Sequence, residues 1–144
     1  MSSEKYVAKA QTIINATADK VWNALTNPEM IKKYMFGTTV ISEWKEGSKI
    51  VWKGEWEGKS YEDKGKILQL ENQKKIQYSH YSPLSGLHDI PENYHTITID
   101  LSEIENKTAV FLTQDHNSTV DDRLHSEKNW SMMLTSLKEL LEKK

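Results

Sequence analysis

The stretch TVDDRLHSEKNWSMMLTSLKELLEK, residues 119–143, determines how the rest of the chain must be arranged. Its apolar residues recur every three to four positions between charged or polar ones, which is typical of an amphipathic helix. These apolar residues are Leu124, Trp130, Met133, Leu134, Leu137, Leu140 and Leu141. Ser118 and Asp121 resemble a capping box at its start, while Lys143 and Lys144 suit the negative end of the helix dipole. The sequence therefore predicts one long C-terminal helix with a single apolar face to bury.

The segments before this helix are typical of strands, because β-branched and aromatic residues alternate with polar ones between turn residues. The predicted strands are residues 6–14, 40–44, 49–53, 61–70, 75–81, 94–104 and 108–116. Two short helices are expected after the first strand. Thr17 is placed to cap one that begins at Ala18, and Pro28 is placed to begin another over residues 28–33. Strands in meander order with helices on one sheet face predict an α+β fold.

The clearest hairpin joins the last two predicted strands through a turn at residues 105–107. Pairing Ile104 with Lys107 fixes the register, because a slip of one residue would move every side chain to the other face. The pairs that follow are Leu101 with Val110, Ile99 with Leu112, and His95 with His116.

Two irregular positions shape the predicted sheet. Gly65 interrupts the strand 61–70 and predicts a bulge or a bend where the sheet curves. Residues 82–92 contain two prolines and a glycine and have no usable period. Because long loops inside compact domains are often binding loops, we expect this loop at the mouth of any pocket.

The composition excludes several classes of protein. There is no cysteine, so disulfides, thiol nucleophiles and thiolate metal sites are excluded. The net charge of −2 and a single arginine, Arg123, give no basis for binding nucleic acid. The apolar runs are too short for membrane insertion, and the first residues lack the pattern of a signal peptide. We expect one domain over residues 1–144, located in the cytoplasm.

Short motifs along nearly the whole chain resemble a known family. They are Asn15-Ala16-Thr17, Val21-Trp22, Leu25-Thr26, Pro28-Glu29, the aromatic Tyr34, the Glu46-Gly47 turn, the Gly58 hairpin, Gly65-Lys66-Ile67-Leu68, and Trp130 in a Leu-rich terminal helix. In this order they resemble the START-like (SRPBCC) superfamily, in the branch of the homologue of the activator of the heat-shock-chaperone-90 ATPase. The resemblance implies a helix-grip fold, in which a curved antiparallel sheet of about six to seven strands wraps a long C-terminal helix above a cavity.

The candidate cavity residues combine large aromatic side chains with a few polar ones, as ligand pockets do. They are Tyr34, Phe36, Trp52, Tyr78, His80, His95, Ile97, Gln114, His116, Trp130 and Met133. The three histidines are expected near one end of the sheet, either as a polar cluster or as hydrogen-bonded residues at strand ends. Their spacing does not favour a metal site, and no cofactor is predicted. No residue is assigned a catalytic role.

Three functions remain open at this point. The first is a domain that binds a small apolar or amphipathic molecule under the terminal helix. The second, suggested by the family resemblance, is a stress-related protein that partners a chaperone or another protein. The third is an enzyme of the cyclase or dehydratase kind that uses His80, His95 or His116 as an acid or base. The absence of a nucleophile motif favours a non-catalytic role, and the fold by itself does not decide among them.

Overall fold

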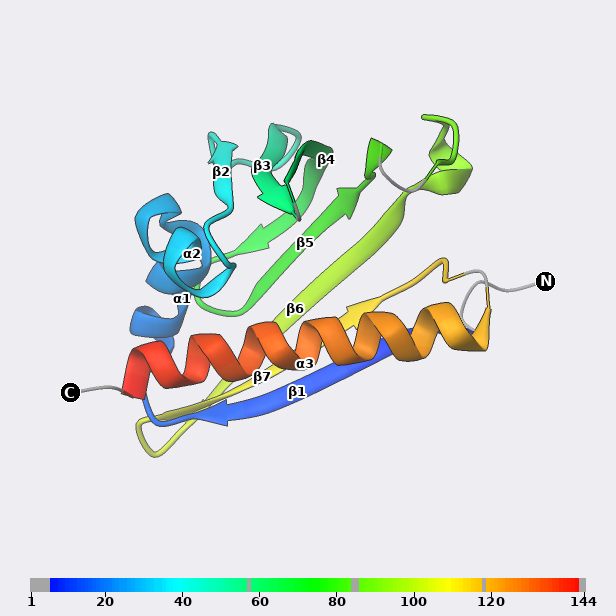
Figure 1. The fold of residues 1–144 in the computed structure, drawn as a ribbon. Helices are drawn as coiled ribbons and strands as arrows, with labels where there is room; N and C mark the ends of the chain where they lie inside the picture. The colour runs from blue at the N-terminus through cyan, green and yellow to red at the C-terminus, as the bar shows by residue number, and fades with distance from the viewer. Residues whose placement is uncertain (1–5, 57, 84–85, 118, 143–144) are drawn as a thin grey trace.

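A computed structural model describes residues 6–56, 58–83, 86–117 and 119–142, and shows a curved antiparallel sheet that wraps one long helix (Figure 1). The sheet has seven strands in the order β1-β7-β6-β5-β4-β3-β2. The strands are β1 (Ala8–Ile14), β2 (Thr39–Ser42), β3 (Lys49–Trp56), β4 (Lys59–Glu71), β5 (Lys75–His80), β6 (His95–Ile104) and β7 (Lys107–Gln114). The helices are α1 (Ala18–Thr26), α2 (Pro28–Tyr34) and α3 (Val120–Glu142), and the 3-10 helix η3 (Pro91–Asn93) precedes β6. The predicted helix-grip fold is confirmed.

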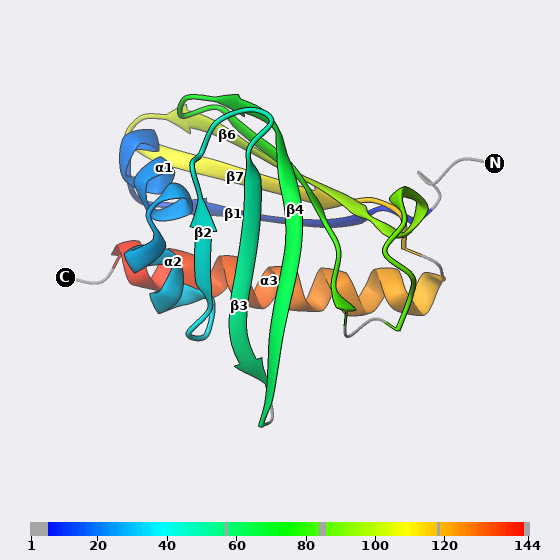
Figure 2. The same ribbon diagram turned by 90° about the horizontal axis from the view of Figure 1, so that it is seen from above.

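Figure 2 shows how the sheet closes around α3. The β1-β7-β6 side lies along the helix, while β4, β3 and β2 curl across it, and α1 and α2 fill the space near its C-terminal end. The residues of α3 that are buried in this wrap are Met133, Leu134 and Leu137. Leu124 belongs to the same predicted apolar series, but it lies before this contact and is half exposed. The buried face of α3 is therefore shorter than the spacing of its apolar residues predicts.

The N-terminus of α1 is not capped by the residue that the sequence predicts. Thr17 occupies the N-cap position of α1, but its hydroxyl bonds to Asp19 and does not cap the helix. The first amide of α1 instead donates to the carboxylate of Glu103 on β6, at 2.6 Å from Ala18 N to Oε1. A distant residue therefore replaces the local cap, which a local pattern cannot predict.

Residue Ser118 of the predicted capping box lies outside the described residues. Within them, the hydroxyl of Thr119 accepts a hydrogen bond from the amide of Asp122 at 3.0 Å, three residues into α3. This is the contact that an N-cap threonine makes.

The β6–β7 hairpin follows the predicted register. Ile104 pairs with Lys107, and the turn residues Glu105 and Asn106 both have positive φ, as a two-residue type I′ turn requires. The pairs Leu101 with Val110 and Ile99 with Leu112 are also formed. The strand that was predicted over 108–116 ends earlier, at Gln114, because His116 adopts a φ of 60° and leaves the ladder. His116 is therefore not paired with His95.

Gly65 allows β4 and β5 to pack closely, and the irregularity predicted at this glycine lies further along β4. The register between β4 and β5 shifts between Ile67 and Gln69. At Gly65 a Cβ atom would lie 2.6 Å from the carbonyl carbon of Ser79 and nearer still to its oxygen. The glycine therefore lets the β5 backbone approach β4 at a distance that a side chain would block.

Side chains of α3 complete the free edge of β1. The amide of Lys9 donates to Glu127 Oε2 at 3.0 Å, and the amide of Asn15 donates to Glu142 Oε2 at 2.7 Å. Lys138 Nζ donates to the carbonyl of Ile13 at 2.7 Å and to Glu142 at 2.7 Å. The hydrogen bond from Lys138 holds the pKa of Glu142 below its usual range. Three main-chain groups along this edge, at Lys9, Ile13 and Asn15, are thus bonded to the helix.

Among the described residues, we find no helix with both the length and the apolar character needed to span a bilayer.

Candidate functional site

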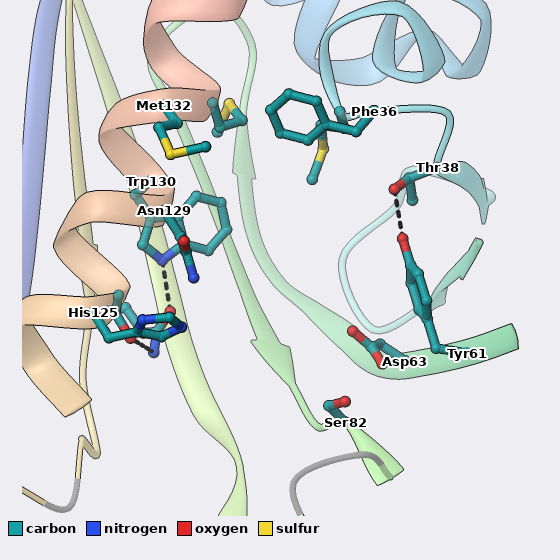
Figure 3. Close-up of a pocket in the computed structure, with 13 residues that line it drawn as sticks. Phe36, Thr38, Tyr61, Asp63, Ser82, His125, Asn129, Trp130 and Met132 are labelled. Carbon is teal, nitrogen blue, oxygen red and sulfur yellow. Dashed lines mark hydrogen bonds between the residues drawn. The ribbon is translucent and has the colours of Figure 1, made fainter. Parts of the chain in front are cut away.

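A pocket of about 580 Å³ opens between α3, β4 and the segment that joins α2 to β2 (Figure 3). Its described lining residues are Met35, Phe36, Thr38, Tyr61, Asp63, Ser82, Gln114, His125, Ser126, Asn129, Trp130, Met132 and Met133. Four of the eleven residues proposed from the sequence line this pocket: Phe36, Gln114, Trp130 and Met133. Ser82, the first residue of the predicted binding loop 82–92, also lies on the wall.

The mouth of the pocket carries two exposed apolar side chains. Phe36 is 64% exposed and Met132 is 50% exposed. Figure 3 shows Phe36 and Met132 facing one another across the upper part of the pocket. Phe36 also adopts a φ of 56°, a conformation that a bulky residue rarely adopts. The Phe36 ring is thus exposed to solvent beside the Met132 side chain, at the entrance of the pocket.

Four of the proposed aromatic residues line a second, much smaller cavity of about 30 Å³, which has room for a water or two. These are Tyr34, Trp52, Tyr78 and Trp130, of which Trp130 also lines the main pocket. The rings of Trp52 and Tyr78 pack with centroids 5.0 Å apart. The hydroxyl of Tyr34 donates to the carbonyl of Ala24 at 2.9 Å. Burial raises the pKa of both tyrosines. Ile97 is fully buried in the core and reaches neither cavity.

The three proposed histidines gather at one end of the sheet but do not line the main pocket. His80 Nε2 lies 3.0 Å from Asp63 Oδ2, and its ring meets Trp52 edge-on at 4.9 Å. His95 Nδ1 donates to the carbonyl of Asp115 at 2.7 Å. His116 is exposed and pairs with the Asp115 carboxylate at 3.0 Å. His80 contacts the pocket wall through Asp63, and His95 contacts it through Gln114, whose Nε2 lies 3.4 Å from His95 Nδ1.

Gln114 is held by a hydrogen-bond network on the α3 side of the pocket. Trp130 Nε1 donates to its Oε1 at 2.6 Å, which fixes the orientation of the amide because an indole nitrogen can only donate. The Nε2 of Gln114 then donates to Asn117 Oδ1 at 3.0 Å and to Ser126 at 3.2 Å. The Gln114 amide is therefore occupied by contacts that hold α3 against β7.

Replacing His95 is expected to change how stability depends on pH. Burial lowers the pKa of His95 below its ordinary value of 6.5, so the folded protein takes up this proton less readily than the unfolded chain. Stability from this group is therefore lost as the pH falls below about 6.5. In His95→Asn the amide keeps a donor for Asp115, and the free energy of unfolding should fall less between pH 7 and pH 5 than in the wild type. Urea unfolding at both pH values measures this.

An equal loss in the two proteins over this interval would contradict the assignment. His116→Asn is a suitable control, because it removes an exposed histidine from the same end of the sheet.

The β4 wall of the pocket is absent from the residues predicted from the sequence, although the alternation of β4 indicates it. Ile67 is buried, and side chains in a strand alternate between faces. Tyr61, Asp63 and Gly65 therefore share the inner face with Ile67, which places a phenol and a carboxylate where a core would be apolar. The helical spacing of Ser126 with Trp130 and Met133 similarly identifies the α3 wall.

Among the described residues, no three histidine or acidic side chains come together in a group that could hold a metal ion.

Comparison with known proteins identifies the family. No curated protein matches the chain. The family model described as "Activator of Hsp90 ATPase homolog 1-like protein" matches residues 15–142. The solution structure of ChR145 from Cytophaga hutchinsonii is 59% identical, covers 94% of this chain and 93% of its own, and superposes with a TM-score of 0.83.

More distant structures share the architecture. The solution structure of the Aha1 dimer from Colwellia psychrerythraea is 26% identical, with a TM-score of 0.74 over 95% of this chain and 96% of its own. CalU16 from Micromonospora echinospora is 20% identical, with a TM-score of 0.72 over 92% of this chain and 71% of its own, and shows the fold alone. The chain belongs to the activator of Hsp90 ATPase homologue family, within the START-like helix-grip proteins.

Proposed function

We propose that this protein binds a small, partly apolar molecule in the pocket beneath α3. The observation that carries the proposal is the pocket itself: about 580 Å³, within the range of small-molecule sites, with an apolar part and a polar part. The ligand remains defined by chemistry alone, as an apolar or amphipathic body of this size.

The two parts of the pocket suggest how such a molecule is oriented. Met35, Phe36, Met132 and Met133 form the apolar part; methionine side chains adapt to ligands of different shape. Polar groups lie nearer β4 and the start of α3, including Asp63, Ser82 and Asn129. A ligand that covers Phe36 and Met132 removes exposed apolar surface from water, which favours binding.

A ligand screen with a pocket-blocking variant tests the proposal. Lipids, polyketide-like compounds and small aromatics are screened by thermal shift and native mass spectrometry. A binder present at about 100 times its Kd should stabilise the protein by about 2.7 kcal/mol. In Asn129→Trp an indole occupies the pocket from an exposed position of α3, and binding should fall at least about tenfold.

Lys128→Trp is the matched control, because Lys128 precedes Asn129 on the exposed part of α3 but does not line the pocket. It should bind as the wild type does. Failure of every compound to bind, or equal binding by both tryptophan variants, would contradict the proposal.

A second candidate is a stress-related partner of a chaperone ATPase, as the family description suggests. An exposed apolar group on the outer face of the sheet favours a protein contact away from the pocket. Ile13, Ile104 and Phe111 are 60%, 67% and 40% exposed, and Ile13 pairs with Ala109 two residues from Phe111. A chaperone ATPase assay tests this role: stimulation should occur and should fall in Phe111→Ser. No stimulation by the wild type would exclude it.

A further inference from the structure

Asp63 presents an unused hydrogen-bond acceptor at the wall of the pocket. Its side chain is only 16% exposed, and its Oδ2 pairs with His80 Nε2 at 3.0 Å. Its Oδ1 is buried and has no hydrogen-bond partner among the described residues. Figure 3 shows the Asp63 side chain reaching from β4 toward the pocket, between Tyr61 and Ser82. A buried acceptor without a partner is unfavourable, so a donor supplied at this point would be bound well.

The other polar groups with described contacts on this wall already have partners. The hydroxyls of Thr38 and Tyr61 bond to one another at 2.7 Å, and the Gln114 amide is held by Trp130, Asn117 and Ser126. Two further buried polar atoms lack partners in the described chain, on Trp44 and Arg123, and neither residue lines this pocket. Of the buried polar atoms that lack a partner in the described chain, Asp63 Oδ1 is thus the one on a residue that lines this pocket.

The charges around the pocket favour the same class of ligand. No lysine or arginine is among the described lining residues. Lys64, the neighbour of Asp63 in sequence, forms an ion pair with Asp89. A carboxylate or phosphate in the pocket would therefore meet the Asp63 carboxylate with no described lysine or arginine in the lining to offset the repulsion, and with His125 as the lining imidazole.

We propose, resting on the proposed function, that Asp63 binds the polar end of the ligand and selects a hydroxyl or amine donor over an acid. One carboxylate oxygen stays on His80 while the other accepts from the ligand. The terminal torsion of an aspartate is broad, so a rotation of the carboxylate turns the buried Oδ1 toward the pocket while Oδ2 stays near His80. His80 acts as a positioning residue, held by its edge contact with Trp52. The ligand body extends from Asp63 toward Phe36 and Met132.

A series of three compounds with one ring system tests the selectivity: 2-(1-naphthyl)ethanol, 2-(1-naphthyl)ethylamine and 1-naphthaleneacetic acid. Each is titrated by calorimetry and by two-dimensional NMR at pH 7. The alcohol and the amine should bind with a Kd at least about tenfold lower than the acid, with shifts of the Trp130 indole signal. In Asp63→Asn the ratio between amine and acid should fall by about tenfold or more, because the charge is lost and the shape is kept.

Asp100→Asn is the matched control. Asp100 lies on β6, its carboxylate forms an ion pair with Lys75 of β5 at 3.7 Å, and it does not line the pocket. It should leave all three values unchanged. His80→Gln should weaken the selectivity without abolishing binding, which separates positioning from folding when the melting temperature is measured beside it.

The outcomes separate this inference from the proposed function. If the acid binds as tightly as the other two, or if Asp63→Asn keeps the full preference, the inference is wrong while binding in the pocket stands. The same holds if none of the three compounds binds but members of the wider screen do. If no compound from either set binds, both proposals fall.

Discussion

Gly65→Ala is expected to destabilise the protein by about 3 kcal/mol, at the upper end of what overpacking usually causes. The added methyl group would lie 2.6 Å from the carbonyl carbon of Ser79, which is a main-chain atom and cannot rotate away. To admit it, β5 must separate from β4 beside the bonds between Lys64 and Tyr81, so hydrogen bonds are lost as well as packing. The free energy of unfolding in urea measures the effect.

Gly54→Ala is the control for this experiment, since its methyl group would meet a side chain and not the backbone. The nearest atom is the Tyr61 hydroxyl oxygen at 2.5 Å, at the end of a side chain that can turn away. The loss of stability should therefore be clearly smaller than for Gly65→Ala, with the contact between Tyr61 and Thr38 broken. Equal losses in the two variants would show that close backbone approach is not the reason for Gly65.

Leu137→Ala is expected to lower the free energy of unfolding by about 2–5 kcal/mol. Leu137 is fully buried where α3 meets the sheet, so its removal leaves a cavity as well as less buried apolar area. Because Leu137 belongs to the core cluster that contains Trp52 and against which Trp22, Trp44 and Trp130 pack, the variant should also show weaker near-ultraviolet circular dichroism from the tryptophans. Urea unfolding gives the energy and the spectrum gives the packing.

Leu124→Ala makes the same chemical change on the same helix, at a residue that is 51% exposed. It should change stability by no more than about 0.5 kcal/mol, as surface substitutions usually do. A large loss at Leu124 would mean that the N-terminal part of α3 is packed against something else in solution.

The fold could be predicted because its determinants are local and periodic. The apolar spacing around Leu134 and Leu137 identifies α3, and one pairing, Ile104 with Lys107, fixes the β6–β7 register. The errors arise from a distant contact and from a change of backbone conformation. Ala18 is capped by Glu103, which lies 85 residues further along the chain, and the end of β7 depends on a backbone change at His116. Local patterns do not contain such contacts.

The site was harder to predict, because a pocket is made where packing stops. Trp52 and Tyr78 have the size and polarity of ligand contacts, yet in the structure they pack against each other around a cavity too small for a ligand. Which large aromatics fill the core depends on how far β4 curls over α3, and no spacing in the sequence measures that. Asp63 was not predicted as a pocket residue, because acidic residues near a hairpin are usually solvated. Its position four residues before the buried Ile67 nevertheless places its side chain on the inner face of β4.

The bonds between α3 and β1 also bear on how copies of this protein behave toward one another. An edge strand with open amides and carbonyls is a template on which a second chain can add a strand. Here Glu127, Lys138 and Glu142 bond three of those groups, and the opposite edge, β2, is only four residues long. The charged residues of α3 therefore protect against aggregation. Substitution of these charged residues should therefore lower the solubility of the protein more than its free energy of unfolding.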